Sequence, residues 1–300
     1  MFLPPGCGKS LLAESFPSIL PPLSRASRLE IMSIYQLSGV TNYHPNLPLY
    51  RSPHHSSSGV AIIGGGQNPK PGEISLAHHG VLFLDEIAEF PKKTLEMLRQ
   101  PLEAGVVTIS RARSTATYPS SFILIGAMNP CPCGYLGAKT HYCTCSPKQI
   151  TTYQNRISGP MRDRFDVFLS LRPVDFNPAL ESQRESSEEI QERVSEARLR
   201  QYHRYGKEIT NGRVPYETLL QTSPLSDQQQ RFLQKLANKH GWSNRAQLKI
   251  IRLARTLADL QQGTEVSEQH IWEALKLHSW STAKKQKQTT DSVRQPVTQW

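Results

Sequence analysis

A glycine- and proline-rich segment close to the first residue has the composition of a phosphate-binding loop. Residues 4–10 read Pro-Pro-Gly-Cys-Gly-Lys-Ser, which is most of the Walker A pattern G-x-x-x-x-G-K-[ST]. In that pattern backbone N–H groups surround the phosphates, Lys9 reaches the β- and γ-oxygens, and the Ser10 hydroxyl binds Mg²⁺. The match departs where Leu3 replaces the first glycine, and no strand precedes it, so a chance turn is the alternative. The expected cofactor-binding residues are Pro5, Gly6, Cys7, Gly8, Lys9 and Ser10.

Two apolar segments end in polar residues suited to handling magnesium and water. Residues 81–84, Val-Leu-Phe-Leu, lead directly into Asp85 and Glu86, as in a Walker B strand. Asp85 would hold Mg²⁺ and Glu86 would orient and deprotonate the attacking water, unless both are simply solvated acids. Residues 122–128 form a second apolar run that ends in Asn129. This side chain would hold the same water against the γ-phosphate, or would only form a turn.

Four cysteines follow in the pattern C-x-C-x9-C-x-C, at Cys131, Cys133, Cys143 and Cys145. Four thiolates on a short loop are the donor set of a closed, structural Zn²⁺ site, because no position is left for water. Such a site would pin an insertion beside Asn129. The C-x-C spacing is tighter than the usual C-x2-C, so another metal, unligated thiols and disulfides remain alternatives.

Two histidine pairs, His54-His55 and His78-His79, are also candidate metal ligands. Their spacing to one another is unconstrained, so we interpret them as polar loop residues, with His54-His55 in an insertion that could touch DNA.

The first half of the chain carries the pattern of an α/β sheet. We expect buried strands at 81–84, 122–127 and 167–171, a helix at 92–100 and a hairpin beginning at 105. Strands that alternate with helices predict a mostly parallel sheet, whose strand ends would position the polar residues above.

After about residue 177 the pattern becomes helical. We expect helices at 181–205, at 243–263 and after Ser267. Ser243 would cap the second helix, Gly263 would close it, and its apolar stripe would consist of Leu248, Ile251, Ala254, Leu257 and Ala258.

Charge and length narrow the classes of protein. The 300 residues include 35 Lys plus Arg against 25 Asp plus Glu, a net charge of +10. Half of that excess lies between residues 101 and 165, which is compatible with nucleic-acid binding, although many basic proteins bind none. No apolar run approaches the ~20 residues of a membrane helix, no signal peptide opens the chain, and five cysteines are few for a disulfide scaffold. We expect a cytoplasmic protein rather than a secreted, membrane-spanning or disordered one.

Taken together, the motifs resemble those of the magnesium-chelatase-like AAA+ ATPases of the ComM/YifB type. The resemblance is carried by residues 4–10, 51–55, 64–66, 71–78, 82–86, 98–103, 127–134, 156–160 and 254–260. It implies an α/β fold with a P-loop AAA+ parallel-sheet core at 1–178 and an all-α helical lid at 179–281. We expect residues 282–300 to form a disordered basic tail.

The resemblance also implies roles for two arginines. Arg164, in the segment Met-Arg-Asp-Arg-Phe-Asp at 161–166, matches the arginine finger that a neighbouring subunit inserts at the γ-phosphate. The alternative is a surface ion pair with Asp163 or Asp166. Arg245 matches the sensor-2 arginine of the lid, and its place in a first helical turn is electrostatically unfavourable, which hints at another role.

In related rings, a hairpin corresponding to residues 104–121 is aimed at the central pore. Arg111 and Arg113 would then contact the DNA backbone, or would only be solvated.

The expected function is therefore ATP hydrolysis with Mg²⁺, by a homo-oligomeric ring, expected to be a hexamer, that moves on branched or single-stranded DNA. The resemblance links such proteins to branch migration during natural transformation. One alternative is a chelatase-like ATPase that remodels a protein partner or assists metal insertion. Another is a non-functional fragment: family members carry an N-terminal domain, and without a first strand we expect residues 1–300 alone to bind ATP weakly or not at all.

Overall fold

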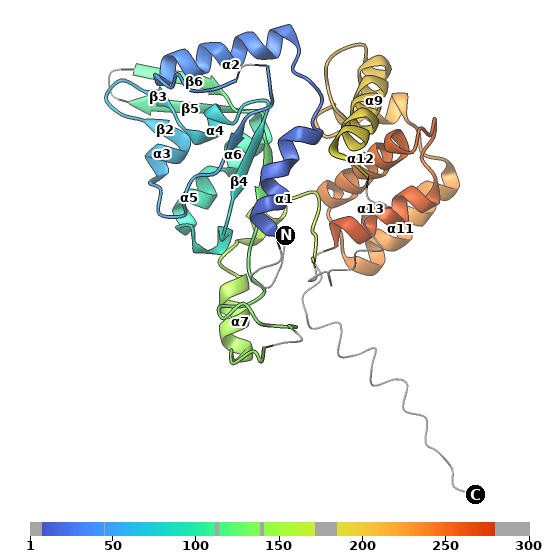
Figure 1. Cartoon of the computed structure of the whole chain (residues 1–300). Helices are drawn as coiled ribbons and strands as arrows, with labels where there is room; N and C mark the ends of the chain where they lie inside the picture. The colour runs from blue at the N-terminus through green and yellow to red at the C-terminus, as the bar shows by residue number, and fades with distance from the viewer. Residues whose placement is uncertain (1–7, 45, 112–113, 139–140, 172–184, 280–300) are drawn as a thin grey trace, which may run out of the picture.

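A three-stranded parallel sheet lies at the centre of the first half of the molecule (Figure 1). The computed structural model describes residues 8–44, 46–111, 114–138, 141–171 and 185–279. The strand order is β1 (Tyr50–Arg51), β4 (Val81–Leu84) and β7 (Ile123–Gly126). In the register, Val81 lies opposite both Tyr50 and Ile123. All four residues of β4 are buried, as a fully apolar central strand requires.

The helices of this half are mostly short. They are α1 (Lys9–Ser15), η1 (Phe16–Ile19), α2 (Arg25–Ser38), α3 (Gly59–Ile63), α4 (Glu73–Leu76), η2 (Ile87–Glu89), α5 (Lys92–Met97), α6 (Arg99–Ala104), α7 (Pro147–Gln154) and α8 (Gly159–Arg162). The expected helix at 92–100 is thus two helices, α5 and α6, which meet at Leu98. The main core brings β4 together with residues of α3, α5 and α7.

Two antiparallel ribbons flank the sheet. The hairpin β5 (Val106–Arg111) and β6 (Ser114–Pro119) confirms the expected one, with Val106 opposite Pro119 and Arg111 opposite Ser114. Val107 and Ile109 alternate with exposed neighbours and enter the main core. The second ribbon pairs β2 (Gly64–Gly65) with β3 (Lys70–Pro71).

At two positions in and beside this short ribbon, only glycine leaves room for the neighbouring backbone. Gly64 has φ +106°, and a Cβ there would lie 2.4 Å from the carbonyl oxygen of Lys70. A Cβ on Gly72 would lie 2.3 Å from the backbone nitrogen of Gly64. Glu73, the next residue, receives a bidentate hydrogen bond from Arg51, with both N–O distances at 2.7 Å. The 51–55, 64–66 and 71–78 motifs therefore meet in space.

The second half is helical and lies beside the α/β part (Figure 1). Its helices are α9 (Ser187–Tyr205), α10 (Tyr216–Thr222), α11 (Asp227–His240), α12 (Asn244–Leu260) and α13 (Glu268–His278). As expected, Ser243 caps α12 by accepting a hydrogen bond from the Ala246 N–H. The C-terminus differs slightly: Gln262, not Gly263, takes the left-handed conformation, while the Gly263 N–H bonds to the Ala258 carbonyl in a Schellman motif.

Polar residues, which the apolar stripe did not predict, lie at the centre of this helical half. Arg255 and Asp259 on α12 are both 0% exposed and are joined at 2.8 Å. Asp259 also accepts hydrogen bonds from Arg204 and Asn211. A buried carboxylate persists because each of its lone pairs has a charged or polar donor.

The expected strand at 167–171 is wrong. Apart from an isolated bridge at Ser170, residues 167–171 are irregular. The Phe168 N–H donates to the carbonyl of Leu277 at the end of α13, and the Phe168 ring packs near His278. The apolar residues of this run are thus partly accounted for by contact with the helical half, which sequence periodicity does not reveal.

Residues 181–184 of the expected helix at 181–205 and the expected tail at 282–300 lie outside the described residues, and α9 begins at Ser187. Within the residues that the structure describes, no helix has the length and apolar character needed to cross a membrane.

Candidate active site

The lysine of the phosphate loop meets the asparagine at the end of β7. Lys9 opens α1, and its Nζ donates a hydrogen bond to Asn129 Oδ1 at 2.7 Å. Both side chains are partly buried, and 120 positions of sequence separate them. The structure thus brings together two residues that the sequence placed in one site. Pro5, Gly6 and Cys7 lie outside the described residues, and Gly8, with φ +70°, precedes α1.

The serine of the loop meets the acidic end of β4. Ser10 Oγ donates to Asp85 Oδ2 at 3.3 Å. The Ile87 N–H bonds to the Ala127 carbonyl at 2.9 Å, and this holds the carboxyl ends of β4 and β7 side by side. A hydroxyl and a carboxylate oxygen are ligands that Mg²⁺ prefers, so this donor pair fits the metal expected with a nucleotide.

Glu86 has a backbone conformation that is rare for a residue with a side chain. Its φ is 48° and its ψ is 45°, which costs of order 1–3 kcal/mol and is often found at functional sites. The Glu86 N–H donates to Asp85 Oδ1 at 2.9 Å, and this contact supports the turn. The Glu86 carboxylate is exposed and therefore accessible to water or substrate.

His55 is a site residue that sequence reasoning missed. Its Nδ1 lies 3.5 Å from Glu86 Oε2, although the histidine pair was interpreted as a loop feature. The signal available in the sequence was only that residues 51–55 form one of the motifs that carry the family resemblance. The structure adds that they follow β1, which pairs in parallel with β4.

The two predicted arginines form a second cluster. Arg164 Nη2 lies 2.8 Å and Arg245 Nη1 lies 3.2 Å from the same oxygen, Oε1 of Glu103. Arg164 is 9% exposed and Arg245 is 59% exposed. Asp166 pairs with Lys249 at 3.0 Å. Arg164 is thus in an ion pair, as its alternative interpretation expected, but with Glu103 in place of Asp163 or Asp166. One carboxylate serves two guanidinium groups, and an excess positive charge remains.

A small cleft of about 330 Å³ lies next to this cluster. Its lining comes from α5, α6 and the segment after α8: Glu96, Arg99, Gln100, Glu103, Ala104 and Arg164. Among the described residues, no hydrogen bond or ion pair joins Arg164 or Arg245 to Lys9, Ser10, Asp85, Glu86 or Asn129. The predicted catalytic residues therefore form two groups within one chain.

The hairpin arginine Arg111 is exposed at the end of β5. Its Nη2 lies over Gly65, within 2.9 Å of where a Cβ would stand. Arg113 lies outside the described residues.

The four cysteines converge as the spacing predicted. Their sulfur atoms all lie within 4.8 Å of one another. A hydrogen bond to the backbone of Tyr135 lowers the pKa of the Cys133 thiol to about 6, while burial raises the pKa of the Cys131 thiol to about 12. None of the four is in a disulfide.

A second group with metal-ligand types consists of Glu30, His78 and His79. The Ser121 N–H donates to His78 Nδ1 at 2.9 Å, so the proton of a neutral His78 is on Nε2, which bonds to Glu30 at 3.0 Å. A protonated nitrogen cannot bind a metal. This geometry favours a hydrogen-bonded network. His78 lies in a turn, as expected of a loop residue, but it is buried.

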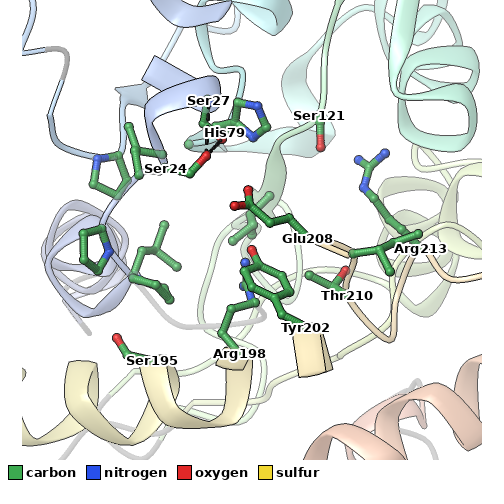
Figure 2. A pocket seen from close by; sticks show the side chains of 18 of the residues that line it. Ser24, Ser27, His79, Ser121, Ser195, Arg198, Tyr202, Glu208, Thr210 and Arg213 are labelled. Carbon is green, nitrogen blue, oxygen red and sulfur yellow. Dashed lines mark hydrogen bonds between the residues drawn. The ribbon is translucent and has the colours of Figure 1, made fainter. Parts of the chain in front are cut away.

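A cavity of about 490 Å³ lies between α9 of the helical half and the amino ends of strands in the sheet (Figure 2). Ser24 and Ser27 at the start of α2 border it on one side, and Arg198 and Tyr202 of α9 border it on the other (Figure 2). Gly80, which precedes β4, also lines it, so it adjoins the amino ends of the strands. It is therefore distinct from the Lys9–Asn129 site at the carboxyl ends.

A P-loop-like lysine and serine at the carboxyl ends of parallel strands, with a helical domain after the sheet, define a protein of the AAA+ class. The family described as "Magnesium chelatase, subunit ChlI" matches residues 1–178, and its C-terminal counterpart matches residues 184–278. The chain belongs to this magnesium chelatase AAA+ family.

Three relatives illustrate the similarity. An "Uncharacterized protein YifB" of Salmonella typhimurium is 42% identical over 277 residues, which cover 91% of this chain and 54% of the relative. The "Competence protein ComM" of Haemophilus influenzae is also 42% identical, over 91% of this chain and 53% of its own. A "Magnesium-chelatase subunit ChlI homolog" of Methanocaldococcus jannaschii is 23% identical over 72% of this chain and 53% of its own. The chain thus spans about half the length of these relatives.

Proposed function

We propose that this chain carries the ATP-hydrolysing unit of a cytoplasmic ring motor that acts on DNA. The observation that supports it most directly is the meeting of Lys9 with Asn129 and of Ser10 with Asp85. In the proposed complex, Lys9 and Asn129 lie on either side of the γ-phosphate, and Ser10 and Asp85 lie on either side of the metal ion.

Each residue of this group then has one task. Lys9 leaves Asn129 to bind the β- and γ-phosphates, and Asn129 orients the lytic water together with Glu86, which accepts its proton. Ser10 and Asp85 would hold Mg²⁺, which neutralises charge on the phosphates when bound. His55, 3.5 Å from Glu86, limits the positions that the glutamate can occupy.

Arg164 and Arg245 complete a different copy of the site. We propose that both contact the nucleotide of a neighbouring subunit after leaving Glu103, because they are paired with Glu103 and not with their own Lys9 group. A guanidinium suits this role because it carries a permanent charge and can bond bidentately. The arrangement requires a closed ring, for which we propose six copies, with boundaries of 1–178 for the core and 179–281 for the lid.

DNA is the proposed substrate because the charge and the named relative agree. The net charge is +10, Arg111 lies exposed at the end of the hairpin, and one relative is called a competence protein. In this proposal the hairpin contacts the phosphate backbone, with no base-specific readout.

The deciding experiment measures ATP hydrolysis by the 300-residue chain with and without branched or single-stranded DNA at rising salt. The DNA proposal predicts stimulation by DNA that weakens steeply with salt, and loss of ATP binding in Lys9→Ala. Arg111→Ala should reduce the slope of log affinity against log salt by about one. ATP binding and hydrolysis that are indifferent to DNA would contradict the DNA proposal.

That contrary result would favour the second candidate, a chelatase-like ATPase that remodels a protein partner or assists metal insertion. The family description supports this candidate. Absence of ATP binding by the wild-type chain would instead favour the non-functional-fragment alternative.

A further inference from the structure

The four cysteine sulfurs are spaced as ligands of one metal ion. Cys131 Sγ lies 3.3 Å from Cys133 Sγ and 3.7 Å from Cys143 Sγ, and Cys133 Sγ lies 3.6 Å from Cys143 Sγ. A disulfide would require about 2.05 Å. Four thiolates at about 2.3 Å around a tetrahedral Zn²⁺ lie about 3.8 Å apart. The separations therefore agree with a mononuclear site and disagree with disulfides.

The loop is folded so that its two ends meet. Gly134 and Gly137 have φ of 82° and 81°, and the Gly134 N–H bonds to the Cys131 carbonyl at 3.0 Å. Farther along, the rings of Tyr135 and His141 stack with centroids 4.7 Å apart. These turns bring the first C-x-C pair back to the second.

The two ends of the loop adjoin two different elements, of which β7 leads into the candidate active site. Cys131 is two residues after Asn129, whose Oδ1 accepts from Lys9. Cys145 directly precedes Ser146, which caps α7 through a capping box. A metal ion bound by all four sulfurs would thus join the end of β7 to the start of α7.

Other contacts already hold α7 against the same point. Gln154 Nε2 donates to the Pro130 carbonyl at 3.0 Å. Tyr153 is buried in the main core, and burial raises the pKa of its hydroxyl to about 12, with the nearby Asn129 backbone acting in the opposite direction. After α7, Arg156 reaches the Ala88 carbonyl at 3.3 Å, near the acidic end of β4.

We infer that Cys131, Cys133, Cys143 and Cys145 bind one Zn²⁺ that clamps the start of α7 to the Asn129 end of β7. The clamp is structural, because four thiolates leave no coordination position open. The clamp keeps Asn129 in place indirectly, because it holds α7, which contains Tyr153, against Pro130, the residue after Asn129. Only the consequence for ATP hydrolysis rests on the proposed function.

Metal content tests the site directly. The reduced 300-residue chain, purified without chelator and analysed by elemental mass spectrometry, should contain one zinc per chain. Cys143→Ser/Cys145→Ser should contain none, while Cys7→Ser, which alters the cysteine outside the cluster, should keep one. Cobalt added to the metal-free protein should give the intense absorption of a tetrahedral cobalt thiolate. No zinc in the wild type, or iron with sulfide in its place, would overturn the assignment.

Hydrogen exchange tests the clamp without any need for ATPase activity. In Cys143→Ser/Cys145→Ser, amides of residues 147–154 should exchange faster by about tenfold or more, because the opening of α7 no longer has to break metal bonds. Amides of α12 should exchange as in the wild type. Unchanged exchange in α7 would overturn the clamp, even if zinc is bound. An inactive wild type with zinc and a protected α7 would contradict only the proposed function.

Discussion

At the scale of single residues, the site depends on side chains that lie just after strands. Asp85 and Glu86 follow β4, and Asn129 follows β7 by three residues. Because parallel strands end at one edge of the sheet, sequence position alone was enough to group them. The left-handed backbone of Glu86 and its neighbour His55 could not be grouped in this way, since neither follows from residue type.

Replacing Glu86 should separate binding from hydrolysis. Glu86→Gln keeps the shape but cannot accept a proton, so kcat should fall by about 10²–10⁴-fold while the Kd for ATP changes little. Asn129→Ala should also lower kcat, because the lytic water loses a partner. Steady-state ATPase assays and nucleotide titrations measure both, with Glu265→Gln on the exposed surface of the lid as the control. A Glu86→Gln protein with unaltered kcat would remove this residue from the proposed mechanism.

The buried histidine His78 should make stability depend on pH. Burial, and the charges of His79 and Arg213, lower its pKa from 6.5 to about 4, against the pull of Glu30. Between these pH values the unfolded chain binds more protons than the folded one. The free energy of unfolding should therefore fall by up to about 3 kcal/mol as pH drops from 6.5 to 4.

Urea unfolding at several pH values measures this slope. His78→Gln should flatten it, and His203→Gln, on an exposed face of α9, should leave it as in the wild type. Burial opposes the shift, but hydrogen bonds from His78 and His79 keep the pKa of Glu30 below its usual 4.5, so that carboxyl acts mainly below this window. A slope that persists in His78→Gln would assign the effect to other groups.

At the scale of elements, the helical half is held together by charge as well as by apolar packing. Helix α12 carries the buried pair Arg255 and Asp259, and α9 adds Arg204 to the same carboxylate. The sequence predicted the apolar face of α12 and its cap. It did not predict that two charged residues on this helix would be buried. Asp259 has further partners on α9 and in the loop that follows it, and Arg255 donates to backbone carbonyls in the loop after α12.

Removal of the buried carboxylate should destabilise the helical half severely. Asp259→Asn leaves the guanidinium groups of Arg255 and Arg204 without their anion, at a cost of about 3–5 kcal/mol. Thermal or urea unfolding monitored by circular dichroism measures the loss. Asp227→Asn, an exposed acid at the start of α11, should change stability by about 0.5 kcal/mol or less. Equal effects of the two substitutions would show that the Asp259 network contributes little.

At the scale of the whole molecule, no hydrogen bond or ion pair joins the two groups of proposed catalytic residues within the described part of the chain. Arg164 and Arg245 share Glu103 and border a cleft, while Lys9 pairs with Asn129 elsewhere. This separation is what a ring with sites between subunits requires.

Mixing two inactive variants should restore activity. Lys9→Ala lacks a working nucleotide site and Arg164→Ala lacks the proposed finger, so a complete site forms where an intact Lys9 meets a neighbour's intact Arg164. If the two variants mix randomly in equal amounts, about a quarter of the sites around a closed ring should be complete. ATPase assays of the mixture measure the recovery.

In the control, Arg164→Ala is mixed with the double variant Lys9→Ala/Arg164→Ala. The double variant offers no arginine finger, so this mixture should restore no activity. Native mass spectrometry would detect whether mixed rings form. Mixed rings that form but stay inactive would contradict the proposed action of Arg164 between subunits.

The sequence by itself determined the strands β4 and β7, the hairpin, the N-terminal cap of α12, and the residues of the Lys9 group and the cysteine cluster. These depend on local periodicity, on capping chemistry and on motifs whose spacing is set by strand ends. Only the tertiary structure decided which partners distant residues have. It joined Arg164 to Glu103 and His55 to Glu86, and it made 167–171 an irregular segment against α13. The physical reason is that an ion pair, or the burial of an apolar run, depends on which surfaces meet, and the pattern along one segment contains no information about the other.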